Sequence, residues 1–120
     1  MAIKKILLVE DNFRIQEIQK IQLEFLGFQV IAAYHGLDAL EIFQNNPDHF
    51  SLVFTDLLMP YMNGDELAHE IRQINPHVPI ILATGHAEVE TQHMLTDGIQ
   101  AVMYKPYGLE QLVTEIDNLV

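Results

Sequence analysis

The fold of this chain is decided by the stretch LVFTDLLMPYMNG, residues 52–64. Its first four residues are apolar or β-branched, which predicts a short buried strand, and Asp56 follows them directly. Met59-Pro60 and Gly64 then indicate a turn, because Pro and Gly interrupt regular structure. The sequence thus predicts a single carboxylate at the point where a buried strand meets a loop, a placement that suits a carboxylate that reacts or binds metal.

Other apolar runs of the chain end in polar residues in the same way. Glu10-Asp11, Thr84 and Lys105 each follow directly on such a run. Parallel strands that are neighbours present their carboxyl ends at one edge of a sheet, where ligands bind. We therefore expect two acids, an acceptor carboxylate, a hydroxyl and an ammonium to converge there.

Five short aliphatic runs alternate with five stretches of helical periodicity, which is typical of an α/β protein with a parallel sheet. The runs lack in-out alternation, so helices are expected on both faces of the sheet. The expected strands lie near residues 4–9, 29–33, 52–55, 78–83 and 101–103. The expected helices lie near residues 13–27, 36–45, 64–74, 88–96 and 109–119.

The spacing of apolar residues also predicts which face of each helix is buried. In the first helix the spacing of three and four predicts a stripe toward the sheet. Its members are Ile15, Ile18, Gln22 and Phe25. The opposite face, with Gln16 and Gln19, is then expected to be solvated, and Leu37 and Leu109 are expected to face the sheet from the second and last helices.

Composition narrows the class of protein. A length of 120 residues predicts one domain over residues 1–120, and a formal charge of −11 with six Lys and Arg argues against binding to DNA or RNA. The absence of cysteine excludes disulfides, and six histidines without i, i+4 pairs or cysteine companions argue against zinc. No apolar stretch approaches the ~20 residues that cross a bilayer, so we expect no membrane contact and a cytoplasmic location.

The loop after the first strand indicates the kind of ligand. A phosphate-binding loop needs glycine at this point, but residues 10–13 read EDNF and would repel a phosphate. Mg²⁺ fits better, because it takes oxygen ligands and would relieve the repulsion between Asp11 and Asp56. With metal bound, Asp56 can attack a phosphoryl donor, and Lys105 and Thr84 can each hold one of its oxygens.

Four short motifs carry a resemblance that covers the whole chain. They are Val9-Glu10-Asp11, Asp56 with Met59-Pro60 and Gly64, Thr84-Gly85, and Lys105-Pro106. Together, at these spacings on a repeated βα pattern, they are highly specific: the chain resembles the receiver domain of bacterial two-component response regulators. The resemblance includes the chemotaxis type and the receivers attached to hybrid kinases, and it implies a flavodoxin-like sheet of order 2-1-3-4-5.

The resemblance implies a function and a set of site residues. Asp56 would accept a phosphoryl group from a histidine kinase or a histidine phosphotransfer protein, in a reaction that needs Mg²⁺, with Mn²⁺ as an alternative. Glu10, Asp11, Asp56 and the backbone carbonyl of Leu58 would hold the metal, and the Lys105-Pro106 bond is often cis. The domain would catalyse only its own phosphorylation and dephosphorylation, and signal to a downstream protein or output domain that the sequence leaves open.

Departures from the family pattern concern the switch and the lifetime of the phosphate. Val102 stands where many receivers have an aromatic residue that rotates inward, and Tyr104 on the same strand face is the candidate substitute. We expect surface packing for Tyr104 and Tyr107. Leu58 and His86 occupy positions that tune the lifetime, and the apolar Leu58 predicts a moderately long one.

Other functions lead to different expectations. The chain fits a phosphorelay or phosphate-sink receiver cut from a hybrid kinase as well as an independent regulator. An aspartyl-nucleophile phosphatase of the haloacid dehalogenase type needs a second acid two residues after the nucleophile, where this chain has Leu58. A degenerate receiver that only docks would normally lack the acceptor or the lysine, and both are present.

Overall fold

The computed structural model describes residues 4–85 and 98–120. Five parallel strands form one sheet in the order β2-β1-β3-β4-β5, which confirms the expected flavodoxin-like arrangement. The strands are β1 (Lys5–Val9), β2 (Gln29–Ala33), β3 (Leu52–Asp56), β4 (Ile80–Thr84) and β5 (Ala101–Tyr104). The fourth strand begins two residues later than predicted, because Pro79 has no N–H to donate and the ladder starts after it.

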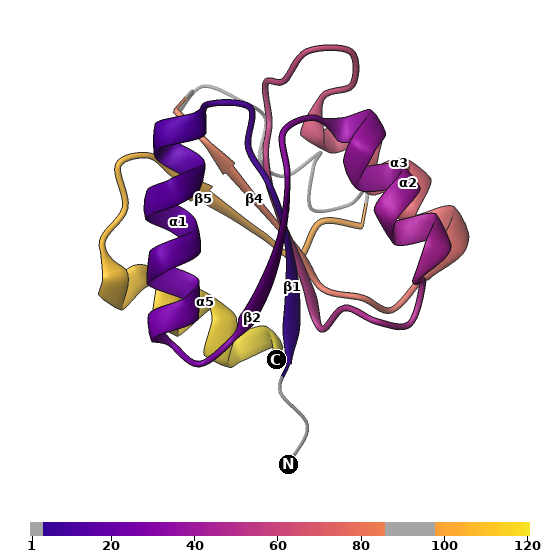
Figure 1. The fold of residues 1–120 in the computed structure, drawn as a ribbon. Coiled ribbons are helices and arrows are strands. Elements are labelled where there is room, and N and C mark those ends of the chain that lie inside the picture. Colours follow the sequence, from indigo (N-terminus) through magenta and orange to yellow (C-terminus); the bar gives the residue numbers. More distant parts are fainter. Residues whose placement is uncertain (1–3, 86–97) are drawn as a thin grey trace.

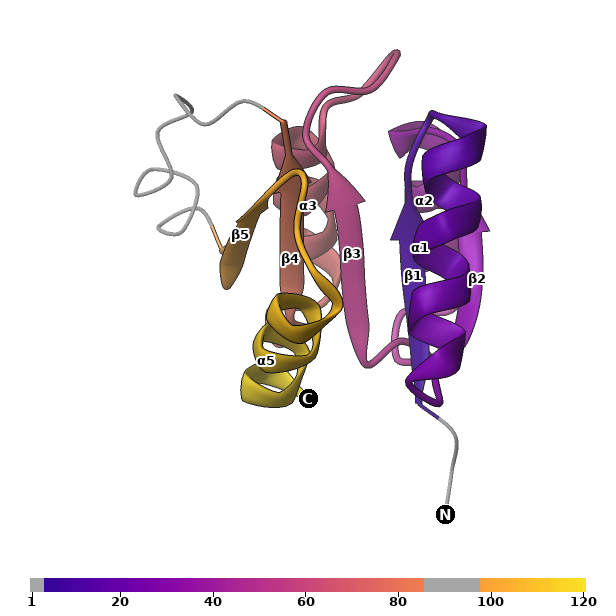
Figure 2. The ribbon, with the colours of Figure 1, turned by 90° about the vertical axis from the view of Figure 1, so that its left-hand side faces the viewer.

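Helices cover both faces of the sheet, as the uniformly apolar strands predict. The described helices are α1 (Phe13–Phe25), α2 (Gly36–Asn45), α3 (Gly64–Ile74) and α5 (Leu109–Leu119). Figures 1 and 2 show α1 and α5 against one face and α2 and α3 against the other. The helix expected near 88–96 and His86 lie outside the described residues. In the described part of the chain, no helix is long and apolar enough to cross a membrane.

The sheet divides the core in two, because successive strand residues point to opposite faces. Leu7 and Val9 of β1 pack in one buried cluster with residues from α2 and α3 such as Phe43. Ile6 and Leu8 pack in the other cluster, with Leu23 of α1 and with two residues of α5. Every one of these strand side chains is fully buried, so β1 is held from both sides.

The predicted orientation of α1 is wrong, and the helix is turned so that its apolar stripe faces outward. Gln16, Gln19 and Leu23 are its buried residues, whereas Ile18 and Phe25 are exposed. The side-chain amide of Gln16 donates to the carbonyl oxygens of Glu10, at 3.2 Å, and Ala33, at 2.9 Å. Burying these amides is possible because each donates a hydrogen bond, which offsets much of the cost of removing a polar group from water.

The predictions for Leu37 and Leu109 are also wrong, because both side chains were expected to face the sheet and both are exposed. Both lie at the beginning of a helix, and Gly36 and Leu112 occupy the buried positions beside them instead. In α3, Leu67 and Ile71 are fully buried.

The chain order reverses between β1 and β3, and this reversal positions the predicted site. β1 and β3 are neighbours, and the connections that leave them run to opposite faces of the sheet, through α1 on one face and α3 on the other. The register pairs Val9 with Thr55, so Glu10 and Asp56, the residues that follow, emerge side by side. Such a switch point opens a crevice at the carboxyl edge of a parallel sheet.

Candidate functional site

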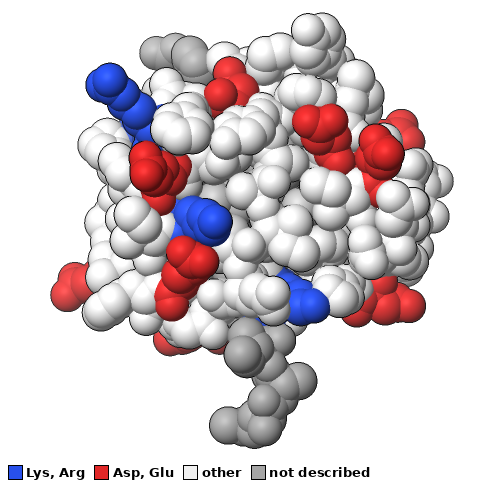
Figure 3. All heavy atoms as spheres, viewed as in Figure 1, with Lys and Arg blue, Asp and Glu red and all other residues white. Residues whose placement is uncertain are grey.

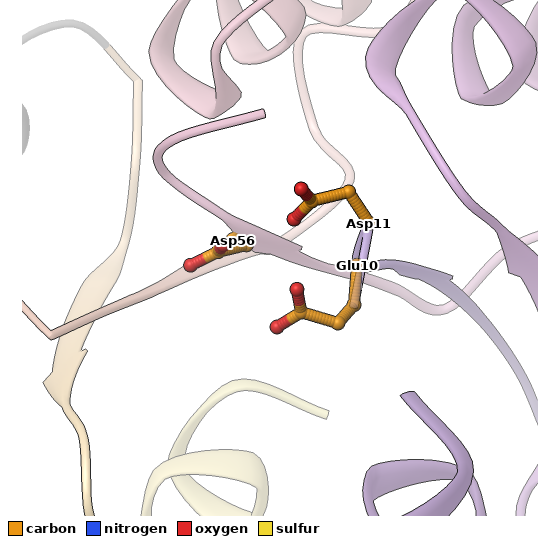
Figure 4. Close-up of side chains that lie close together, drawn as sticks. All are labelled: Glu10, Asp11 and Asp56. Atoms are coloured by element: carbon orange, nitrogen blue, oxygen red, sulfur yellow. The ribbon is translucent and has the colours of Figure 1, made fainter. Parts of the chain in front are cut away.

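Three carboxylates meet at this edge. Glu10 and Asp11 follow β1 and Asp56 ends β3, and one carboxylate oxygen from each lies within 4.8 Å of the others. Figure 4 shows the side chains of Glu10 and Asp11 extending toward Asp56 from the neighbouring strand end. Glu10 is buried, Asp11 is exposed and Asp56 is intermediate, so the group opens to solvent on one side. A set of oxygen-only ligands at this spacing suits Mg²⁺ or Mn²⁺.

Lys105 is the cation that faces these acids. Its Nζ donates to Glu10 Oε1 at 2.7 Å and to Asp56 Oδ1 at 3.1 Å. The peptide bond between Lys105 and Pro106 is cis, as the family resemblance implies. The structure therefore brings the ammonium from the loop after β5 across to the ends of β1 and β3.

Burial and pairing change the pKa of both partners. Burial raises the pKa of Glu10 above its usual range, and the hydrogen bond from Lys105 only partly opposes this effect. Burial by itself would lower the pKa of Lys105, but the hydrogen bond to Glu10 and the charge of Asp56 outweigh it and leave that pKa raised. The lysine therefore stays protonated at neutral pH, and its ammonium can bind negatively charged oxygens.

The turn after Asp56 is shaped by backbone contacts that need glycine. Gly64 N donates to the carbonyl oxygen of Leu57 at 2.7 Å, and a Cβ at Gly64 would lie 2.1 Å from the carbonyl oxygen of Asp56. Thr55 Oγ1 donates to that same Asp56 oxygen at 2.9 Å. Leu58 lies in this turn with its side chain exposed, and its backbone carbonyl is the metal ligand that the family resemblance implies.

Thr84 closes the other side of the site. It is buried at the end of β4, and its carbonyl oxygen accepts a hydrogen bond from the backbone N–H of Lys105 at 2.8 Å. The backbone N–H of Leu57 in turn donates to the carbonyl oxygen of Ala83 at 3.1 Å. These bonds fix the ends of β3, β4 and β5 relative to one another, so all the predicted site residues lie at one edge of the sheet.

Sequence reasoning missed a layer of polar side chains behind the site. Gln16 holds the carbonyl of Glu10, and Gln19 Nε2 donates to the hydroxyl of Tyr107 at 3.1 Å. The Tyr107 ring meets Phe54 edge-on at a centroid distance of 6.1 Å, so the expected surface packing of Tyr107 is wrong. Burial raises the pKa of the Tyr107 hydroxyl. A glutamine on a helix gives no sequence signal for such a role, because the same residue is ordinary on a solvated face.

The fold and the acidic site define the class of protein: a doubly wound α/β domain with an acid and lysine site at its switch point. The chain belongs to the family of response regulator receiver domains, whose family model matches residues 6–117. It is 36% identical to the response regulator receiver protein CpdR of Brucella abortus, over 98% of this chain and 97% of CpdR. It is 30% identical to the sensor kinase CckA of Brucella abortus, over 96% of this chain but only 12% of the kinase.

A solved structure of the same kind is the response regulator TrrA of Thermotoga maritima, in complex with Mg²⁺-BeF. The TM-score is 0.90 at 28% identity, and the match covers 98% of this chain and 100% of TrrA. Receiver domains are signalling modules of two-component systems that interact with histidine kinases or phosphotransfer proteins, and the family binds Mg²⁺ at an acidic pocket. Relatives include both independent regulators and parts of sensor kinases.

Proposed function

We propose that this protein takes a phosphoryl group from a phosphohistidine donor onto Asp56, in a Mg²⁺-dependent reaction, and thereby switches a surface that a partner reads. The observation that carries the proposal is the position of the Asp56 carboxylate, with the ammonium of Lys105 at 3.1 Å on one of its oxygens and two further acids beside it. Acids and a lysine that were isolated from solvent would serve only as a structural ion pair. In this protein the group lies at the open edge of the sheet, where a phosphoryl donor can reach it.

In the proposed transfer, a carboxylate oxygen of Asp56 attacks the phosphorus of the donor. The new oxygen–phosphorus bond forms as the nitrogen–phosphorus bond breaks, and the electron pair of the broken bond stays on the donor's imidazole nitrogen, which takes a proton from water. The product is an acyl phosphate and a free histidine. The transition state is loose, so the protein contributes mainly position and charge.

Lys105 would stabilise the product by exchanging its bond to Asp56 for one to a phosphoryl oxygen. An ammonium about 4 Å from a unit charge contributes about 4 kcal/mol at an effective dielectric constant of about 20. Thr84, buried at the neighbouring strand end, would take another phosphoryl oxygen through its hydroxyl. Thr84 ends β4 and Lys105 begins the loop after β5, and a displacement of this loop would reach the surface, which is how the added charge would become a signal.

Glu10, Asp11, Asp56 and the carbonyl of Leu58 would hold the Mg²⁺ ion. When bound, the ion neutralises charge on the transferred group. The burial of Glu10 and its bond to Lys105 leave Asp11 and Asp56 as the more open oxygen ligands. Mn²⁺, which accepts the same ligands, would substitute.

Intact-mass measurement after incubation with acetyl phosphate or a phosphohistidine protein tests the proposal. The wild type is expected to gain one phosphoryl group only when Mg²⁺ or Mn²⁺ is present, whereas Asp56→Asn gains none. Asp48→Asn, which removes an exposed acid elsewhere, is the matched control and should label like the wild type. Equal labelling of wild type and Asp56→Asn would show that the acceptor is another residue.

Lys105→Ala separates the acceptance of phosphate from the switch. This variant should still gain the phosphoryl group, more slowly, but should lose the chemical-shift changes that phosphorylation or beryllofluoride causes beyond the site.

We propose a single receiver domain over residues 1–120, located in the cytoplasm. The similarity to part of a sensor kinase favours, as a second candidate, a relay or sink receiver that passes the group on to a phosphotransfer histidine. Shift changes confined to residues around Asp56 would favour this second role.

A further inference from the structure

The loop that carries Asp11 is tied down by one side chain of α1, that of Gln16. The side-chain amide of Gln16 donates to the carbonyl oxygen of Glu10 at 3.2 Å and to that of Ala33 at 2.9 Å. An amide nitrogen carries two hydrogens, so each carbonyl can take one. The backbone N–H of Gln16 donates to the carbonyl oxygen of Asn12 at 2.9 Å. One residue therefore holds the main chain on both sides of Asp11.

The bond from Gln16 to Glu10 orients the peptide group that joins Glu10 to Asp11. The backbone N–H of Glu10 is held separately, because it donates to the carbonyl oxygen of Ala33 at 3.1 Å. After Asp11, the backbone N–H of Asn12 donates to Oε2 of Glu10, also at 3.1 Å. The peptide groups before and after Asp11 thus each have a fixed partner.

Asp11 itself depends on these backbone contacts. Its side chain is exposed and forms no hydrogen bond or ion pair with any other residue in the described part of the chain. Glu10 differs, because its carboxylate is bonded directly to Lys105. Figure 4 shows the side chain of Asp11 extending toward Asp56. The place of this carboxylate beside Asp56 therefore rests on the position of its backbone, which Gln16 holds.

We propose that Gln16 is a positioning residue of the metal site, and that it holds Asp11 where a small cation such as Mg²⁺ requires it. The inference rests on the proposed function, because it takes Asp11 and Asp56 as metal ligands. Mg²⁺ demands near-ideal octahedral geometry with ligands at about 2.0–2.1 Å, whereas Ca²⁺ accepts more flexible arrangements at about 2.3–2.6 Å. A site whose ligand is free to move therefore loses affinity for Mg²⁺ before it loses affinity for Ca²⁺.

A neutral amide suits this role better than a charged donor. Gln16 is 6% exposed, whereas Figure 3 shows charged side chains of α1 at the surface of the molecule. A buried ammonium or guanidinium behind Glu10 would add positive charge near the bound cation and weaken its binding. Gln16 supplies its N–H donors without that charge.

Titration of the unphosphorylated protein with Mg²⁺, and separately with Ca²⁺, followed by NMR chemical shifts, tests the inference. Gln16→Met keeps nearly the same length but has no side-chain N–H, and it should bind Mg²⁺ about tenfold more weakly. Its affinity for Ca²⁺ should fall by less than about threefold, because Ca²⁺ tolerates a displaced ligand. Gln16→Asn keeps the amide but is one methylene shorter, so it should lose the reach to both carbonyls and behave like Gln16→Met.

Two control variants separate positioning from stability. Leu23 is 1% exposed on the same helix, so Leu23→Val should lower the melting temperature by leaving a cavity, but it should not change the affinity for Mg²⁺. Gln22 makes no side-chain hydrogen bond with the described residues, and Gln22→Met should change neither quantity. Gln16→Met should lower the melting temperature as well, because the carbonyl of Glu10 loses its donor.

Labelling with acetyl phosphate provides an independent readout. The Mg²⁺ concentration that gives half the maximal rate should rise about tenfold in Gln16→Met. At saturating Mg²⁺ the rate should stay within about threefold of wild type, because Asp56 and Lys105 are unchanged. A general distortion of the site would instead lower the rate at saturation.

Equal affinity of Gln16→Met and wild type for Mg²⁺ overturns the positioning role and leaves the proposed function standing. An equal loss of affinity for Mg²⁺ and Ca²⁺ also overturns it, as does a comparable loss in Leu23→Val, because either result would reveal a general disturbance of the fold. If Asp11→Asn binds Mg²⁺ as tightly as wild type, the metal site of the proposed function fails, and the role of Gln16 fails with it.

Discussion

The buried hydrogen bond between Gln19 and Tyr107 predicts that the damage done by a substitution at Tyr107 largely disappears when Gln19 is substituted as well. Gln19 is only 5% exposed, and its amide nitrogen donates to the Tyr107 hydroxyl at 3.1 Å. Its amide oxygen, Oε1, is buried and has no hydrogen-bond partner. The amide nitrogen of Gln19 therefore has a hydrogen-bond partner, whereas its amide oxygen has lost its water without gaining one.

The expected free energies follow from this inventory. Tyr107→Phe removes the partner of the amide nitrogen, leaves a wholly unpaired buried amide and should cost about 1–3 kcal/mol. Gln19→Met leaves the hydroxyl without the amide but also removes the unpaired Oε1, so the two effects offset and the net cost should stay below about 1 kcal/mol. In the double variant neither polar group is left, and its stability should lie within about 1 kcal/mol of wild type.

Urea unfolding of the four proteins, followed by circular dichroism, measures these differences. Tyr61→Phe is the control, because Tyr61 is 81% exposed and its hydroxyl should contribute less than about 0.5 kcal/mol. Additive costs in the double variant, or a Gln19→Met variant less stable than Tyr107→Phe, would refute the reasoning about the unpaired oxygen.

Three further predictions concern the turn, the metal and alkaline pH. Gly64→Ala should cost about 3 kcal/mol or more, because its Cβ would overlap a backbone oxygen, whereas Gly85→Ala, with open space at its Cβ, should change thermal stability little. Asp11→Asn should be no less stable than wild type without metal, since it removes repulsion among acids, but a Mg²⁺-dependent rise in melting temperature should be lost; a surviving rise would contradict the metal site. The pKa of Tyr107 is raised in the folded state, so its neutral hydroxyl stabilises the protein below the unfolded pKa of about 10, and this contribution is lost as the pH rises further. Urea unfolding above about pH 10 should therefore show that wild type loses more stability than Tyr107→Phe.

The strands and the position of the site could be predicted from the sequence because both depend on local patterns. A buried parallel strand is a continuous apolar run, and a polar residue at its end necessarily falls at the edge of the sheet. Glu10, Asp56 and Lys105 were identified in this way, and the structure brings them into contact. Gly64 marks the turn because glycine interrupts regular structure, and in the structure a Cβ at Gly64 would overlap the carbonyl oxygen of Asp56.

The orientation of α1 could not be predicted, because it depends on partners far along the chain. Burial of Gln16 is favourable only where the carbonyl oxygens of Glu10 and Ala33 can accept its hydrogen bonds. Burial of Gln19 likewise requires the hydroxyl of Tyr107 as a partner. Apolar periodicity counts side chains without regard to such partners, and α1 has apolar residues on both sides. The pattern therefore indicated a helix correctly and its inward face wrongly.

The inward amides and the outward aliphatic residues of α1 lie on separate faces of one helix. Substitutions at Ile18 or Ile21 change what approaches the protein without reaching the loop that begins at Glu10. A substitution at the buried Gln16 is expected to disturb that loop while leaving the exposed residues of the helix unchanged. The exposed face of α1 can therefore be substituted to bind a new partner without changing the residues at the edge of the sheet.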